Sequence, residues 1–342
     1  WKLILLIVII FAMVHSVQFL IPMHFSWSRF AFPAAILAML FGILIDRATA
    51  LAGVVLMAMI AGLLNGFDFF AALSALVVGS VAVLSLRNIN TRGDVMTAAA
   101  YLTIVYIPLV ASLQFISLST GTQLWMDYVF AFGNAILSPI LVLGLVYIFE
   151  LTFRISTDLS LLELVDLNRP LLRELALKSP GTYHHSLMVG SLAEAAARSI
   201  GANSLLTRAG ALYHDIGKMR NKEYFIENQE AGSENIHDRL PPTKSAEIVI
   251  QHVTYGLELA KKHRLPQQVQ DFISQHHARS RLKYFYAKAV NEIGDSVNEE
   301  LFRYPGPKPQ TKETAILMLA DLVEAATRTI ETTNSDEIRL VV

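Results

Sequence analysis

The first 150 residues consist almost entirely of apolar runs that approach the length needed to cross a lipid bilayer. A helix spans the bilayer core with roughly 20 apolar residues. Six runs come close to this length, with short polar or turn-forming breaks between them: about 3–22, 30–45, 48–64, 67–86, 96–118 and 128–150. The sequence therefore predicts a polytopic transmembrane helical bundle, for which the lipid bilayer is one partner.

Charge is distributed unevenly along the 342-residue chain. Residues 1–152 hold five basic and five acidic side chains, whereas the remaining 190 residues hold 23 and 24. The charged fraction of 17% falls below the quarter, roughly, that is usual in soluble proteins, and the deficit lies in the first half. Because neither half is strongly basic, binding of a nucleic-acid polymer by bulk electrostatics is not expected. The lack of cysteine excludes disulfides, thiolate zinc sites and cysteine nucleophiles.

The positions of the basic residues predict the orientation of the spans. An even number of spans puts both ends on one side, and that side receives Lys2, Arg47, Arg87, Arg92 and Arg154. The positive-inside rule makes it the cytoplasmic side. We therefore expect a multi-pass protein of the plasma membrane with its second half in the cytoplasm.

The membrane half carries few ionisable groups within its spans, and His15 is the one candidate. Transporters and pumps usually place such groups near the membrane midplane, so an anchor or signal transmitter is favoured over a transporter. The first run lacks a small-residue cleavage site and is interpreted as a span rather than a signal peptide. Since Trp1 stands where a Met would open a full chain, we expect the chain to be part of a longer protein.

From residue 151 the pattern changes to amphipathic helices. Apolar residues at helical spacing between 160 and 177 predict a short connector that is interrupted at Pro170. The expected organisation is a transmembrane region at 1–152, a connector at 153–180 and an all-helical domain at 181–342. Within the last region we expect helices at about 184–200, 204–217, 243–263, 266–277, 283–300 and 311–331. The predicted fold class is all-α throughout.

Histidines gather in the second half, where eight of the ten lie after residue 180. His184-His185 and His252 each have a structural explanation, as a helix start and as a buried, hydrogen-bonded ring. Asp321 is harder to explain as a structural residue, because an unpaired carboxylate on an apolar helix face is costly to bury. Metal ligation would offset this cost for the whole set together. The candidate ligands are His185, His214, Asp215, His252, His276, His277 and Asp321.

Several motifs carry a family resemblance. The order of these residues, including the run Tyr213-His214-Asp215-Ile216-Gly217-Lys218, matches HD-domain metallophosphohydrolases. The runs that flank these residues are specific to a smaller group of HD-domain proteins. They are 181–186, 224–229, 285–289 and 304–310, followed by 312–315. They resemble the seven-transmembrane HD-domain proteins, the PgpH-like cyclic di-AMP phosphodiesterases, over essentially the whole chain. In that family an extracellular sensory domain and one further span precede the part seen here.

The resemblance implies two divalent metal ions, manganese or iron, in a cytoplasmic HD domain. It implies that one ion is held by His185, His214, Asp215 and Asp321. The other would be held by His252, His276 and His277, with Asp215 bridging the two. Nitrogen and oxygen ligands without thiolate suit iron, manganese or zinc. Two adjacent ions suit hydrolysis of a phosphodiester.

Other residues are candidates for catalysis or substrate contact. Asp215 and Lys218 are the expected catalytic residues, and Lys218 is placed to contact a phosphate oxygen, although a surface lysine without a role is an open alternative. Relatives commonly carry Gly-Thr after the paired histidines, where this chain has Ala278-Arg279, so Arg279 is a candidate phosphate ligand. His184 and Tyr286 lie in the resembling motifs and are further candidates for substrate binding.

The function expected from these features is hydrolysis of cyclic di-AMP to linear pApA under the control of a membrane or extracellular sensor. Cyclic di-GMP or another nucleotide is an alternative substrate, since the ligand set suits all of them. A receptor that binds a nucleotide without turnover is an alternative from another class, and the complete ligand set argues against it. A homodimer would suit signalling, but no interface can be identified in the sequence.

Overall fold

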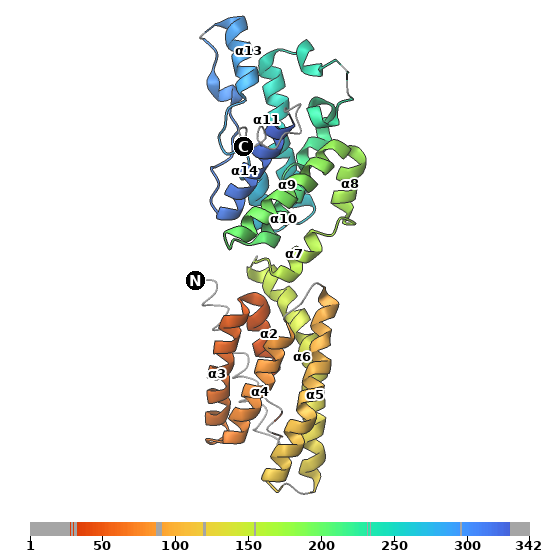
Figure 1. The fold of residues 1–342 in the computed structure, drawn as a ribbon, viewed down its shortest axis with the longest axis vertical. Coiled ribbons are helices and arrows are strands. Elements are labelled where there is room, and N and C mark those ends of the chain that lie inside the picture. Colours follow the sequence, from red (N-terminus) through yellow and green to blue (C-terminus); the bar gives the residue numbers. More distant parts are fainter. Residues whose placement is uncertain are drawn as a thin grey trace. The chain divides into compact units, whose positions relative to one another are not determined.

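The computed structural model describes residues 28, 30, 33–86, 91–118, 121–153, 155–230, 232, 234–294 and 296–328. Every regular element of this part is a helix, apart from one isolated β-bridge between Arg281 and Arg303. The chain divides into two compact units, Trp1–Leu159 and Ser160–Val342 (Figure 1). The predicted all-α fold is therefore confirmed for the described residues.

The first unit contains five described helices, which lie where five of the six spans are predicted. They are α2 Ala34–Leu44, α3 Arg47–Leu64, α4 Phe69–Ser85, α5 Arg92–Ile116 and α6 Thr122–Phe153. By length and composition α5 and α6 are able to cross a membrane, and the other three are shorter apolar helices. The predicted span at 3–22, with His15, lies outside the described residues.

Small residues let the helices of this unit approach one another closely. A Cβ added to Gly79 on α4 would lie 2.9 Å from the Val54 side chain on α3. Ala50, Ala82 and Ala98 are fully buried in the same unit, whereas Ile104, Leu141 and other large aliphatic side chains of α5 and α6 are exposed. Small residues inside and large apolar residues outside are typical of helices packed within a bilayer.

A buried carboxylate in this unit was not expected. The predicted span at 128–150 begins one residue after Asp127, but α6 begins at Thr122 and Asp127 is only 3% exposed. Its oxygens accept hydrogen bonds from Ser28 Oγ, from Gln114 Nε2 at 3.2 Å and from Gln123 Nε2 at 3.1 Å. Neutral donors therefore satisfy this carboxylate within the helical unit.

The helices that follow agree in order with the prediction but differ at several ends. They are α7 Asp158–Leu164, α8 Pro170–Lys178, α9 Pro180–Ser199, α10 Ser204–Tyr213, η2 Ile216–Tyr224, η3 Ile226–Asn228, η4 Ile236–Arg239, α11 Pro242–Lys262, α12 Gln267–Gln275, α13 Lys283–Ile293, η5 Glu299–Phe302 and α14 Lys312–Thr327. The helix predicted at 184–200 begins earlier, at Pro180, which occupies the first turn of α9, where its missing N–H costs nothing. The predicted helix at 283–300 ends at Ile293, since Gly294 takes a positive φ of 80°.

The core of the second unit holds together the helices that carry the candidate metal ligands. Leu161, Leu172 and Leu175 of the predicted connector are buried in one cluster with Tyr213 of α10, whose hydroxyl donates to the Leu164 carbonyl at 2.9 Å. A second cluster joins α9, α10, α12 and α14 through Val189, Ala193, Ala211, Phe272 and Leu317. This packing fixes the ends of α10 and α12 against the middle of α9 and α14.

Candidate metal centre

Five elements of the second unit present the seven predicted ligands to one place. His185 lies on α9, and His214-Asp215 directly follows α10. His252 lies on α11, His276-His277 directly follows α12, and Asp321 lies on α14. All seven are buried except His277, which is partly exposed. Their donor atoms form two groups, within each of which these atoms lie within 4.8 Å of one another: Asp215, His252, His276 and His277, and His185, His214 and Asp321.

The group of His185, His214 and Asp321 lies around one oxygen of Asp215. His214 Nε2 lies 3.1 Å and His185 Nε2 3.5 Å from Asp215 Oδ2. Asp321 Oδ1 lies 3.0 Å from His185 Nε2 and 3.9 Å from His214 Nε2. Two imidazole nitrogens and two carboxylates therefore converge, as the sequence resemblance implies for the first ion.

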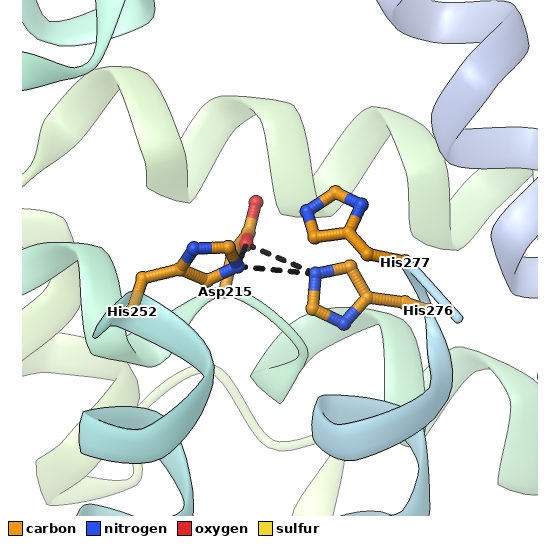
Figure 2. Close-up of side chains that lie close together, drawn as sticks. All are labelled: Asp215, His252, His276 and His277. Atoms are coloured by element: carbon orange, nitrogen blue, oxygen red, sulfur yellow. Dashed lines mark hydrogen bonds and ion pairs between the residues drawn. The ribbon is translucent and has the colours of Figure 1, made fainter. Parts of the chain in front are cut away.

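The group of His252, His276 and His277 lies around the other oxygen of the same carboxylate. His252 Nε2 lies 3.4 Å and His276 Nε2 3.6 Å from Asp215 Oδ1. The two histidine nitrogens are 3.3 Å apart. Figure 2 shows Asp215 pointing into the space between the rings of His252, His276 and His277. Each oxygen of Asp215 thus faces a different group, which is the arrangement that a bridging carboxylate requires.

Hydrogen bonds on the far side of the rings orient them. Nδ1 of His214 donates to the Ala211 carbonyl at 2.7 Å, and Nδ1 of His252 donates to the Val249 carbonyl at 2.6 Å. His276 Nδ1 lies 3.0 Å from the Ile273 carbonyl. A ring that donates from Nδ1 keeps a lone pair on Nε2, and in all three rings Nε2 faces the clusters. Such contacts fix the tautomer and direction of metal-ligating histidines.

The pKa values of the candidate ligands favour the binding of a cation. Burial lowers the pKa of His252 to about 3 and holds that of His277 well below its usual range, so both rings are neutral ligands at neutral pH. Burial also acts to lower the pKa of His185, but the close carboxylates of Asp215 and Asp321 raise it to about 10. Burial would raise the pKa of Asp215, yet the neighbouring His214 ring and Lys218 ammonium hold it well below its ordinary value. The carboxylates therefore stay ionised and attract cations.

Buried polar atoms without a hydrogen-bond partner show whether the candidate ligands suit metal ions. His185 Nε2, His214 Nε2 and Asp215 Oδ1 are buried without a hydrogen-bond partner among the described residues. A buried polar atom without a partner costs about 1–3 kcal/mol. Divalent ions between the two groups would satisfy all three atoms, and a nitrogen and oxygen donor set suits iron, manganese or zinc. The residues present therefore fit a two-ion site.

Lys218 lies inside the site rather than on the surface. It follows Asp215 by one turn on η2, its side chain is 13% exposed, and its Nζ lies 2.8 Å from Asp215 Oδ2. Burial acts to lower its pKa, but Asp215 and Glu227 raise it, so the ammonium stays charged. Lys218 is therefore not a surface residue, and its role in catalysis stays a prediction.

Three predicted substrate contacts pair with residues outside the ligand groups. His184 is exposed, and its ring contacts Tyr183. Arg279 is exposed and donates to Glu300 at 3.1 Å. Tyr286 packs its ring against the guanidinium of Arg281 at 4.3 Å. Their assignment to substrate binding stays a prediction.

Sequence analysis missed three residues of the site. Glu324 Oε2 accepts from His185 Nδ1 at 2.7 Å, and its position one turn after Asp321 on α14 is a signal that could have found it. Glu227 accepts from Lys218 Nζ at 2.8 Å, and it lies in the run 224–229 that resembles the family. Tyr304, from the run 304–310, stacks on His277 with ring centroids 4.1 Å apart. These three residues contact the candidate ligands His185 and His277 and the neighbouring Lys218, and so help to hold their side chains in position.

Replacing Glu324 by Gln should weaken the binding of one of two divalent ions by 10–100-fold, on the order of what outer partners contribute. The amide keeps the shape but removes the charge that makes His185 a stronger donor. Titration of the metal-stripped chain with Mn²⁺ would count tight sites. Arg328→Met is the matched control, because it removes the other partner of Glu324 and leaves the carboxylate. Equal weakening of both sites, or none, would contradict this role.

Comparison with known proteins gives two family matches that together cover most of the chain. A family described as 7TM receptor with intracellular HD hydrolase matches residues 2–157, and the HD domain matches residues 182–326. The gap between the matches, residues 158–181, includes the boundary between the two compact units after Leu159.

Two curated relatives are similar over almost the whole chain. The cyclic-di-AMP phosphodiesterase PgpH of Bacillus subtilis (strain 168) is 39% identical over 332 residues, which are 94% of this chain and 46% of that protein. The protein of the same description from Listeria monocytogenes serotype 1/2a (strain 10403S) is 40% identical over 322 residues, 92% of this chain and 44% of its own. The chain thus spans less than half the length of these relatives.

Among solved structures, one similar to this chain is the L. monocytogenes PgpH HD domain in complex with cyclic-di-AMP. It is 49% identical, covers 52% of this chain and 82% of its own, and has a TM-score of 0.49.

Proposed function

The chain belongs to the family of seven-transmembrane receptors with an intracellular HD hydrolase, and from this premise we propose that it is a membrane-bound, metal-dependent phosphodiesterase that hydrolyses cyclic di-AMP to linear pApA. The observation that carries the proposal is the carboxylate of Asp215, with one oxygen toward each of two groups of metal-type residues. The substrate follows from the relatives, because both curated relatives are described as cyclic-di-AMP phosphodiesterases.

The chain's own residues account for binding and orientation at the phosphodiester. His185, His214, Asp215 and Asp321 would hold one ion, and His252, His276 and His277, with Asp215, would hold the other. When bound, two such ions supply Lewis-acid charge and an activated water for attack at phosphorus. Lys218 keeps a charged ammonium beside the bridging carboxylate, where it is placed to bind a non-bridging phosphate oxygen.

Hydrolysis of one phosphodiester bond of cyclic di-AMP consumes one water molecule. The water oxygen joins phosphorus, the bond from phosphorus to a 3′-oxygen breaks, and that oxygen leaves with a proton. The product carries a free 5′-phosphate and a 3′-hydroxyl, which is pApA. Manganese or iron is the metal we expect, since the donor set consists of imidazoles and carboxylates.

Turnover by the purified chain in detergent with Mn²⁺ or Fe²⁺ would test the proposal directly. We expect cyclic di-AMP to be hydrolysed in preference to cyclic di-GMP, single-stranded RNA to stay intact, and metal content to approach two ions per chain. Preference for cyclic di-GMP would reassign the substrate within the same chemistry. Tight nucleotide binding without any turnover would instead support a receptor and contradict the enzyme.

We also propose residues 1–152 as the membrane-spanning part and a cytoplasmic position for the domain at 181–342. The distribution of Lys2, Arg47, Arg87 and Arg92 supports this orientation. The connector at 153–180 would pass signals from the membrane to the catalytic helices, since its leucines share a core with α10. Fusing a reporter that is active only outside the cytoplasm to residue 328 should give no signal in this orientation.

A further inference from the structure

The Lys218 ammonium lies between two carboxylates. Its Nζ is 2.8 Å from Asp215 Oδ2 and 2.8 Å from Glu227 Oε1, and the Phe225 ring centroid lies 5.1 Å from it. The side chains of Lys218 and Glu227 are 13% and 9% exposed. Water therefore screens this charge little, and its position is decided by the two acceptors.

One of these acceptors is also a predicted metal ligand. The oxygen that Lys218 approaches, Asp215 Oδ2, is the one that faces the Nε2 atoms of His185 and His214. A divalent ion held by these histidines and Asp215 Oδ2 would bring positive charge close to the ammonium. The ion and the lysine therefore compete for one carboxylate oxygen.

The other acceptor is anchored independently of the metal ligands. Thr182 Oγ1 donates to Glu227 Oε1 at 3.1 Å, and Thr182 exchanges two hydrogen bonds with the side chain of Asn228, at 2.8 and 3.1 Å. A Cβ on Gly181 would lie 1.7 Å from the Glu227 carbonyl, so only glycine permits this approach of α9 to η3. Glu227 is therefore a negative charge held in place beside the Lys218 ammonium.

We propose that Glu227 is a positioning residue that draws the Lys218 ammonium away from Asp215 Oδ2, so that a divalent ion binds this oxygen while the lysine stays in the site for a phosphate. The inference rests on the proposed two-ion function and adds a residue to which sequence analysis gave no role. Without the Glu227 charge, Lys218 has Asp215 as its remaining anionic contact within 4 Å among the described residues, and its competition with the ion becomes stronger.

The test is a double-mutant cycle on metal binding, without substrate. The full chain in detergent is stripped of metal and titrated with Mn²⁺ by calorimetry, as the unmodified chain, Glu227→Gln, Lys218→Met and the double variant. We expect Glu227→Gln to lower the affinity for one of the two ions, the one at the group of His185, His214 and Asp321, about 10-fold, as outer partners do. Lys218→Met should raise affinity, and Glu227→Gln in that background should cost less than about 3-fold, because coupled residues are not additive.

Glu227→Asp is the second variant, since it keeps the charge and should retain most of the affinity. An equal loss on Glu227→Gln with and without Lys218 would overturn the proposal, because Glu227 would then act on the ion directly. Unchanged affinity in Glu227→Gln would overturn it as well. Either result would leave cyclic di-AMP turnover by the unmodified chain untouched, so the proposed function would stand. Absence of Mn²⁺ binding in the unmodified chain would overturn both.

Discussion

Replacing Asp215 by Asn should abolish turnover of cyclic di-AMP, with a loss on the order of 10⁴-fold or more, as expected when a residue used by the whole catalytic group is removed. The same change should remove tight binding of both metal ions rather than one. The reason is geometric, since Oδ2 faces His185 and His214 while Oδ1 faces His252 and His276. Turnover of the cyclic dinucleotide and metal content of the purified variant would measure both losses.

The fold should survive this change. Asn has almost the volume of Asp, and Lys218 keeps its ion pair with Glu227 at 2.8 Å, so no buried charge is left alone. Asp238→Asn is the matched control, because it removes an exposed carboxylate of the same unit and should leave metal content and turnover unchanged. If Asp215→Asn kept one tight ion and part of the activity, a single-ion mechanism would replace the bridged site.

The convergence of the candidate ligands was predictable because few residue types carry this chemistry. Histidine is scarce in the chain, and an aspartate on an apolar helix face such as Asp321 demands a partner. Family resemblance then gave the ligand order, and the structure brings all seven residues together in the predicted two groups around Asp215.

The supporting residues were not predictable in the same way. Glu227 and Glu324 are two of 29 acidic residues, and nothing in their types separates them from surface glutamates. Their roles depend on contacts across the fold, from η3 to α9 and from α14 to α9. Asp127 shows the same limit in the first unit, because the partners that allow its burial come from α5 and from residue 28.

Helix ends were the least predictable feature, and the reasons are local. Periodicity extended the helix after Ser204 to residue 217, whereas the α-helix ends at Tyr213 and a 3₁₀ helix begins at Ile216. That break sets His214 and Asp215 outside the regular α-helix, where both side chains reach the ligand groups. The spacing of apolar residues does not by itself predict a helix break that the geometry of the candidate ligands requires.

Replacing Gly217 by Ala should destabilise the second unit by about 3 kcal/mol, which for this size lowers Tm by roughly 6–12 °C. A Cβ at this position would lie 1.8 Å from the His252 carbonyl oxygen and 2.6 Å from the Gly256 nitrogen. Both are backbone atoms of α11, so no side-chain rotation relieves the overlap. The added methyl must push η2 away from α11, and this separates Asp215 from His252. Thermal unfolding of the full chain and its Mn²⁺ content would record both effects.

Gly190→Ala provides the matched control for this prediction. Its Cβ would lie 3.6 Å from the Ala211 Cβ, an ordinary contact, and it lies within α9, where alanine is favoured over glycine by about 0.5–1 kcal/mol. We therefore expect opposite signs from the same chemical change, with Tm unchanged or raised for Gly190→Ala and lowered for Gly217→Ala. If both variants unfolded at the temperature of the unmodified chain and bound two ions, the close approach of η2 to α11 would not be what holds the two sides of the metal centre together.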